Sequence, residues 1–180
     1  MIILLGLIVL LALWAVGIYN GLIKARNLVR EAFSGIEVFL KKRFDLIPNL
    51  VEVVKGYAKH ESETLAKVMQ YRAERGTNNV DDVAKSDQKV SEALVNVRAV
   101  AEAYPDLKAD TQYQQLMNDL SEMESELAGS RRYYNGAVRA YNDKLMVFPT
   151  NLFANMFNFQ AEKYYEIEDA AQRQAPQVKF

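Results

Sequence analysis

The sequence has no cysteine, one histidine and almost no net charge, and its 180 residues include only 8 glycines and 4 prolines. The lack of cysteine excludes disulfides, thiolate catalysis and cysteine-ligated zinc or iron–sulfur sites. A net charge of −1 gives no basis for nucleic-acid binding, because no excess of basic residues is available to neutralise phosphates. Scarce glycine and proline favour long helices over a turn-rich β fold.

The longest uncharged run lies at the N-terminus. Residues 1–23, MIILLGLIVLLALWAVGIYNGLI, contain no charged side chain. A helix that crosses the hydrocarbon core needs about 20 mainly apolar residues, so we predict a transmembrane anchor here. A cleaved signal peptide is the alternative, but no basic residue precedes the run and the best cleavage pattern, at residues 15–17, is weak. The residues assigned to the anchor include Ile2, Leu13, Trp14 and Ile23.

Basic side chains follow this run, and none precedes it. Lys24, Arg26 and Arg30 come directly after the apolar residues. The positive-inside rule then predicts that Met1 lies outside and that the chain after the span lies in the cytoplasm. We therefore expect a single-pass protein of the cell (inner) membrane, with the lipid bilayer as one partner.

Apolar residues at helical spacing continue through most of the remaining chain. They predict helices over residues 22–72, 80–104 and 107–147, and a short helix from 150 or 151 to about 165. A loop at residues 74–79, Pro105 and Pro149 separate these helices. The predicted class is all-α: an N-terminal transmembrane helix, then an elongated antiparallel bundle of three long helices plus a short C-terminal helix. The predicted domains are the anchor at 1–23, the bundle at 24–167 and a polar, disordered tail at 168–180.

Residues 40–61, LKKRFDLIPNLVEVVKGYAKHE, contain the groups that most resemble a chemical site. The single histidine, His60, has no second histidine or cysteine to complete a common zinc site, so we interpret it as a helix-surface or interface residue. Arg43 lies beside the apolar stripe and either extends past it to water or meets an acid on another helix. Pro48 either kinks one helix or separates two, with Asp45 capping the second; the unbroken periodicity favours a kink. The candidate interaction or structural residues here are Arg43, Asp45, Pro48, Asn49, Tyr57, His60 and Glu61.

Residues 145–159, LMVFPTNLFANMFNF, hold more large apolar side chains than one helical stripe accommodates. They either plug one end of the bundle or form a patch for a second subunit, another protein or lipid. Two Tyr-Asn pairs seven residues apart lie just before this segment and share one helix face, where tyrosines can pack their rings and bond outward. The candidates in this region are Tyr134, Asn135, Tyr141, Asn142, Phe148, Pro149, Phe153 and Phe157.

Three pieces of the sequence resemble the LemA family of bacterial membrane-anchored proteins. They are YNGLIKARNLVREAFSGIEVFLKKRFDLIPNLVEVVKGYAKHE, PDLKA at residues 105–109, and YNGAVRAYNDKL leading to FPTN. Their order and spacing match the family, although Glu37 stands where the family usually has aspartate. The resemblance implies a transmembrane helix, a bundle of long antiparallel helices and no catalytic residues. It also implies an alternative role as an adaptor beside a membrane metalloprotease.

We therefore expect a non-enzymatic, membrane-anchored helical scaffold that acts through protein–protein contacts and forms a homo-oligomer. Anchoring in one plane raises the effective concentration of neighbouring copies, which favours self-association. The alternatives are an adaptor or regulator of a membrane protease, an enzyme with a site near His60, and a sensor that signals through Pro48. No cofactor, metal or nucleic-acid partner is predicted.

Overall fold

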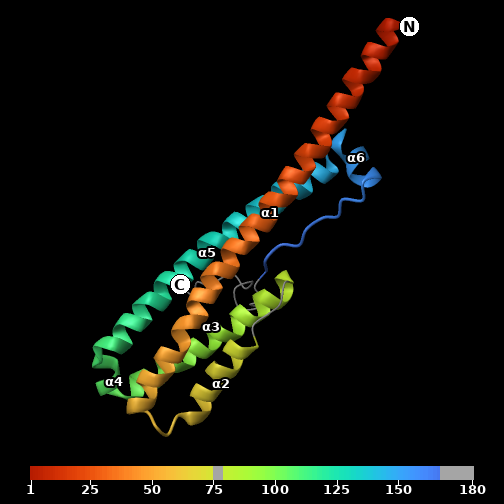
Figure 1. Cartoon of the computed structure of the whole chain (residues 1–180). Helices are drawn as coiled ribbons and strands as arrows, with labels where there is room; N and C mark the ends of the chain where they lie inside the picture. The colour runs from red at the N-terminus through yellow and green to blue at the C-terminus, as the bar shows by residue number, and fades with distance from the viewer. Residues whose placement is uncertain (75–78, 167–180) are drawn as a thin grey trace, which may run out of the picture. The chain divides into compact units, whose positions relative to one another are not determined.

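The computed structural model describes residues 1–74 and 79–166, which form helices and no strand (Figure 1). The elements are α1 (Ile2–Tyr57), α2 (Ser62–Ala73), α3 (Val80–Ala103), α4 (Pro105–Ala109), α5 (Thr111–Met146) and α6 (Thr150–Met156). The predicted all-α class is therefore confirmed for the described part of the chain. The predicted tail at 168–180 and most of the predicted loop at 74–79 lie outside the described residues.

Helix α1 begins in the apolar run and continues far beyond it, over 56 residues. Side chains at residues 2–13 are exposed, whereas from Leu22 onward a residue is buried at every third or fourth position. Among the described residues, α1 is the helix that is long and apolar enough to cross a membrane, by its length and composition. An apolar helix surface that the rest of the chain leaves uncovered is suited to contact with lipid.

The prediction of one helix over residues 22–72 is wrong near its C-terminal end. The chain leaves α1 at Tyr57, makes a turn and starts α2 at Ser62. The reversal lets α2 pack Leu65 and Val68 into the core, where they are 1% and 0% exposed. The apolar stripe has its longest gap after Ala58, across this turn, so the sequence contained a signal for the break.

Proline 48 does not divide α1, and the alternative of two helices with Asp45 capping the second is wrong. Proline has no backbone N–H, so it cannot bond to the carbonyl four residues earlier, which belongs to Phe44. Arg72 of α2 occupies this acceptor instead: its Nε donates to Phe44 O at 2.9 Å. Pro48 therefore leaves the Phe44 carbonyl of α1 free to accept from Arg72, and this bond holds α2 against α1.

The described residues form two compact units, and α1 and α5 each contribute to both. Unit 1 comprises Met1–Leu40 and Glu124–Tyr164. Within it the chain from α5 to α6 runs antiparallel to α1 (Figure 1): Tyr134 of α5 lies 5.7 Å from Phe33 between ring centroids, and Phe153 of α6 lies 6.0 Å from Trp14. The unit's buried apolar residues include Leu22, Val29, Ala32, Ile36, Leu127, Tyr134, Val138 and Tyr141.

Unit 2 comprises Lys41–Met123 and the described residues after Tyr164. The end of α1 runs antiparallel to α2, because a turn joins them and Arg72, near the end of α2, bonds back to Phe44 of α1. Helix α3 then reverses direction alongside α2, where Lys89 pairs with Glu74 (Figure 1). Helix α3 begins where it was predicted, with the Asn79 side chain accepting from the Asp81 amide at 3.1 Å. The buried apolar residues include Ile47, Leu50, Val54, Leu65, Val68, Val90, Val97 and Leu107.

The predicted C-terminal helix ends earlier than expected, at Met156 rather than near residue 165. Asn158 has φ 54°, and Phe159 N donates to Ala154 O at 2.9 Å while Asn158 N donates to Asn155 O at 3.2 Å. This pattern is a Schellman motif, which terminates a helix with a left-handed residue. Residues 157–164, named here the C-terminal strap, then continue without helix.

Candidate interaction site

An open groove lies in unit 2 where the last turns of α1 face the start of α5. Its volume is about 690 Å³. Both apolar and polar side chains line it, so its chemistry suits a protein surface as well as a small molecule. The lining residues on α1 are Asn49, Glu52, Val53, Gly56 and Tyr57, and those at the α4–α5 junction are Asp110, Thr111, Gln112, Gln115 and Leu116.

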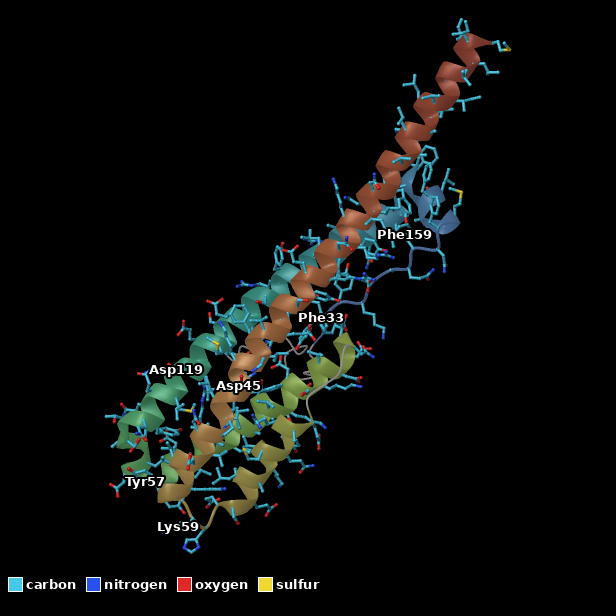
Figure 2. The ribbon with its side chains drawn as sticks, in the orientation of Figure 1. Phe33, Asp45, Tyr57, Lys59, Asp119 and Phe159 are labelled. Carbon is cyan, nitrogen blue, oxygen red and sulfur yellow. The ribbon has the colours of Figure 1, made fainter. Side chains whose placement is uncertain are left out.

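Tyr57 and Asp110 join the two sides of this groove. The Tyr57 hydroxyl donates to Asp110 Oδ2 at 2.8 Å, and the Tyr113 amide donates to Asp110 Oδ1 at 2.9 Å. Asp110 therefore caps α5 and holds the end of α1 with the same carboxylate. Figure 2 shows Tyr57 at this end of α1, next to Lys59 in the turn that follows.

These hydrogen bonds move the pKa of Asp110 and the pKa of Tyr57 further from neutral pH. The Tyr113 amide, and then the Tyr57 hydroxyl, lower the pKa of Asp110 by bonding to its charged form. Bonding to Asp110 raises the pKa of Tyr57. A general acid or base works best with a pKa near the operating pH. Neither group is thus adjusted for proton transfer at neutral pH.

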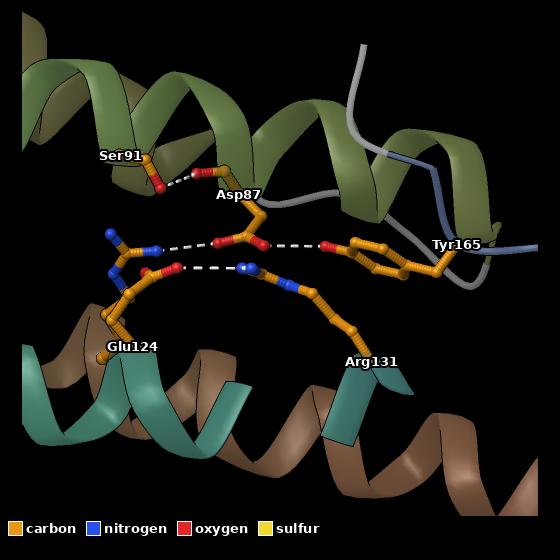
Figure 3. A network of polar contacts seen from close by, with 6 residues as sticks. Asp87, Ser91, Glu124, Arg131 and Tyr165 are labelled. Carbon is orange, nitrogen blue, oxygen red and sulfur yellow. Dashed lines mark hydrogen bonds and ion pairs between the residues drawn. The ribbon is translucent and has the colours of Figure 1, made fainter. Parts of the chain in front are cut away.

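Arg43 pairs with an acid on another helix, Asp87 of α3, which was one of the two alternatives predicted for it. Arg43 Nη1 lies 2.8 Å from Asp87 Oδ1, and the two side chains are only 5% and 2% exposed. The Tyr165 hydroxyl donates to the second carboxylate oxygen, Oδ2, at 2.7 Å, and Ser91 Oγ donates to the Asp87 carbonyl at 3.0 Å (Figure 3). Multiple bonds compensate the buried charge, so this network is structural rather than reactive.

The other candidates of residues 43–61 lie at the surface of unit 2. His60 is exposed in the turn between α1 and α2, so its predicted place on a helix is wrong. Glu61 directly precedes α2. Asn49 is an exposed lining residue of the groove, and Asp45 is exposed and pairs with Lys41. Across residues 1–74 and 79–166, no three His, Cys, Asp or Glu side chains gather as a metal site would require.

In unit 1, the Tyr-Asn pairs of α5 hold the C-terminal strap. Tyr134 donates to Lys163 O at 2.8 Å, and Tyr141 donates to Gln160 O at 3.0 Å. Asn142 Nδ2 donates to the Glu162 carbonyl oxygen at 2.9 Å, and Asn142 Oδ1 accepts from the Glu162 amide at 3.0 Å. These side chains satisfy backbone groups that a non-helical segment leaves unpaired. Asn135 lies half-buried on the same helix.

Also in unit 1, α6 lies against the apolar part of α1. Tyr19 meets Phe157 at 4.9 Å and Phe159 at 5.8 Å between ring centroids, and Arg26 lies 5.1 Å from the Phe159 ring. Phe159 is 8% exposed, whereas Phe148, beside half-buried Pro149, is 73% exposed. Residues 145–159 therefore contain both a packed face and an exposed one.

Comparison with known proteins places these features in one family. A sequence model of the LemA family matches residues 32–180. Protein LemA of Metamycoplasma hominis is 31% identical over 160 residues, which cover 85% of this chain and 72% of that protein. The chain belongs to the LemA family.

More distant similarity extends to proteins with another name. Magnetosome protein MamQ 2 of Paramagnetospirillum magneticum is 24% identical, and Magnetosome protein MamQ of Magnetospirillum gryphiswaldense is 21% identical. Each alignment covers 84% of this LemA-family chain and 66% of the relative, so the chain spans about two thirds of these relatives' length. Neither the family description nor these names indicates a catalytic activity. With the exposed apolar helix, they support a membrane-associated helical protein of the LemA family.

Sequence reasoning missed three residues of this LemA-family structure. Asp87 occupies a place on the apolar stripe of α3, four residues after Val83 and three before Val90, and an acid at such a place is a usable signal for a buried ion pair. The capping role of Asp110 was missed because one helix was predicted over residues 107–147, whereas α5 begins at Thr111. Tyr165 was expected at the end of the short C-terminal helix, and no pattern in the sequence assigns its hydroxyl to Asp87.

Proposed function

We propose that this LemA-family protein is a non-enzymatic, membrane-anchored scaffold that self-associates through the groove of unit 2. The observation that carries the proposal is the groove itself. The groove is open, and both apolar and polar side chains line it. Its Tyr57–Asp110 hydrogen bond joins the end of α1 to the start of α5. Such a surface is suited to contact rather than to proton transfer.

A second copy of the chain is the proposed occupant. Copies that are each anchored by their own helix meet in the plane of one membrane, where their effective concentration is high. The proposed membrane is the cell (inner) membrane, with Met1 outside and the helical units in the cytoplasm, supported by the basic residues that follow the apolar run.

Gly56 offers a direct test of the groove. A Cβ built at this position meets nothing within 4 Å, so Gly56→Ala leaves the groove open and is the matched control. Gly56→Phe instead places a phenyl ring over the groove. Because the chain has no native cysteine, Gln115→Cys gives one defined crosslinking position on the groove wall.

The experiment is in-membrane crosslinking from position 115 in both backgrounds. We expect crosslinked dimers with Gly56→Ala and roughly tenfold fewer with Gly56→Phe, at equal helix content by circular dichroism. Equal dimer yield in the two backgrounds would contradict the groove as the interface. Crosslinks to a heterologous membrane enzyme, without self-contacts, would favour the adaptor role instead.

A further inference from the structure

Helix α6 carries an exposed apolar face that the proposed self-association does not use. Leu152 and Met156 lie four residues apart on this helix and are 58% and 66% exposed. The last residue of α5, Met146, and the turn after it, with Val147 and Phe148, add side chains that are 71%, 60% and 73% exposed. Five large apolar side chains close together in sequence form a patch that a soluble surface rarely leaves open.

The contacts within unit 1 fix the level of this patch along α1. Phe153 of α6 lies against Trp14, and Phe157, just after α6, lies against Tyr19. Both α1 residues belong to the uncharged run of residues 1–23. At 1.5 Å per residue, they stand about 14 Å and about 6 Å before Ile23. Helix α6 therefore lies alongside the membrane-length segment rather than beyond it.

Basic side chains mark the end of the uncharged run at Ile23. The Phe159 ring packs against Tyr19 and also has the Arg26 guanidinium over it, 5.1 Å from the ring centroid. Lys24, directly after the uncharged run, and Lys144, in the last turn of α5, are both exposed. Basic side chains at the end of a span reach lipid phosphates, and Trp and Tyr are enriched at membrane interfaces. The chain thus changes from apolar to basic just past the level of α6.

The composition of α6 fits an interfacial position better than the bilayer centre. Asn155 is exposed beside the apolar pair, and Thr150 and Asn151 open the helix. An amphipathic helix at the interface lies about 5–10 Å into the boundary between headgroups and acyl chains, where polar side chains remain hydrated. The distances obtained from Tyr19 and Trp14, about 6 Å and about 14 Å, overlap this range.

We propose that α6 and the turn before it form a second membrane-contact element, with Leu152, Met156 and Phe148 inserted into the lipid interface beside the anchor. The bilayer is the occupant of the apolar patch. This inference requires the anchor to cross a membrane, but it does not depend on self-association or on the orientation of the chain.

The test measures the depth of nitroxide labels on the full chain in vesicles of phosphatidylcholine and phosphatidylglycerol. Single cysteines replace Leu152 and Met156, and the absence of native cysteine makes the labelling specific. Two references have similarly exposed apolar residues: Leu7 in the anchor, 54% exposed, and Val95 on α3, 61% exposed. Collision rates with oxygen, which partitions into lipid, are compared with those of a water-soluble nickel chelate.

We expect labels at positions 152 and 156 to collide with oxygen more than with nickel, with ratios closer to position 7 than to position 95. Ratios equal to those at position 95 would overturn the proposal, since the patch would then face water. Low collision rates with both reagents would also overturn it, because protein would cover the patch. Spin–spin broadening that vanishes on dilution with unlabelled chain would identify a second copy as the cover and refute lipid contact.

Discussion

Replacing Asp87 by alanine should destabilise unit 2 far more than any surface change. The substitution removes the carboxylate that accepts from Arg43 at 2.8 Å and from Tyr165 at 2.7 Å. Both members of the ion pair are at least 95% buried, so water does not replace the lost partner. Breaking a buried pair by removing one member costs about 3–5 kcal/mol. We expect the free energy of unfolding to fall by that amount.

The assay is urea denaturation of the full chain in mild detergent, followed by circular dichroism. Asp45→Ala is the matched control, because the Lys41–Asp45 pair has side chains 61% and 52% exposed and an exposed pair contributes about 0–1 kcal/mol. Tyr165→Phe should fall between them, at about 1.5–3 kcal/mol, the value of a hydrogen bond to a charged group. The double substitution Arg43→Met with Asp87→Leu should recover much of the loss, because it removes both charges. If Asp87→Ala costs no more than Asp45→Ala, the reasoning about this network is wrong.

Three further predictions follow from other contacts. The pKa of Asp110 is lowered in the folded chain, so its contribution to stability is present above its unfolded pKa and is lost as pH falls through the folded value; acid unfolding curves of Asp110→Asn should lack this loss. Asn142→Ala removes two bonds to the C-terminal strap and should cost about 1–3 kcal/mol, with faster proteolysis after residue 157 as the readout and unchanged proteolysis as the contrary result. Pro48→Ala supplies an N–H that competes with Arg72 for the Phe44 carbonyl, so Arg72→Met should cost about 1 kcal/mol in the native background and less beside Pro48→Ala; equal costs by urea denaturation would contradict this role.

The sequence predicted those parts of the fold that depend on local periodicity. Helix α3 starts at Val80, as predicted, because its N-cap and its apolar spacing are both local signals. The turn after Tyr57 was missed because helical spacing continues on both sides of it. The gap in the apolar stripe after Ala58 indicates a break but does not show that α2 packs back against α1. The early end of α6 was missed because its left-handed residue is Asn158 rather than glycine.

The candidate site was predictable only in part, since its partners are distant in the chain. Arg43 could be identified as a cation on an apolar stripe, but Asp87 lies 44 residues away and Tyr165 lies 78 residues beyond Asp87. The groove needs Tyr57 and Asp110, which are 53 residues apart, to meet. Such pairs depend on how the helices pack, which periodicity does not encode.

Copies of this LemA-family protein are proposed to associate with one another in the membrane. Counting photobleaching steps of the singly labelled full chain in supported bilayers tests this proposal most directly. We predict two or more steps per spot, persisting when the surface density is lowered, and mostly single steps for Gly56→Phe. Single steps for the native chain at every density would contradict the account.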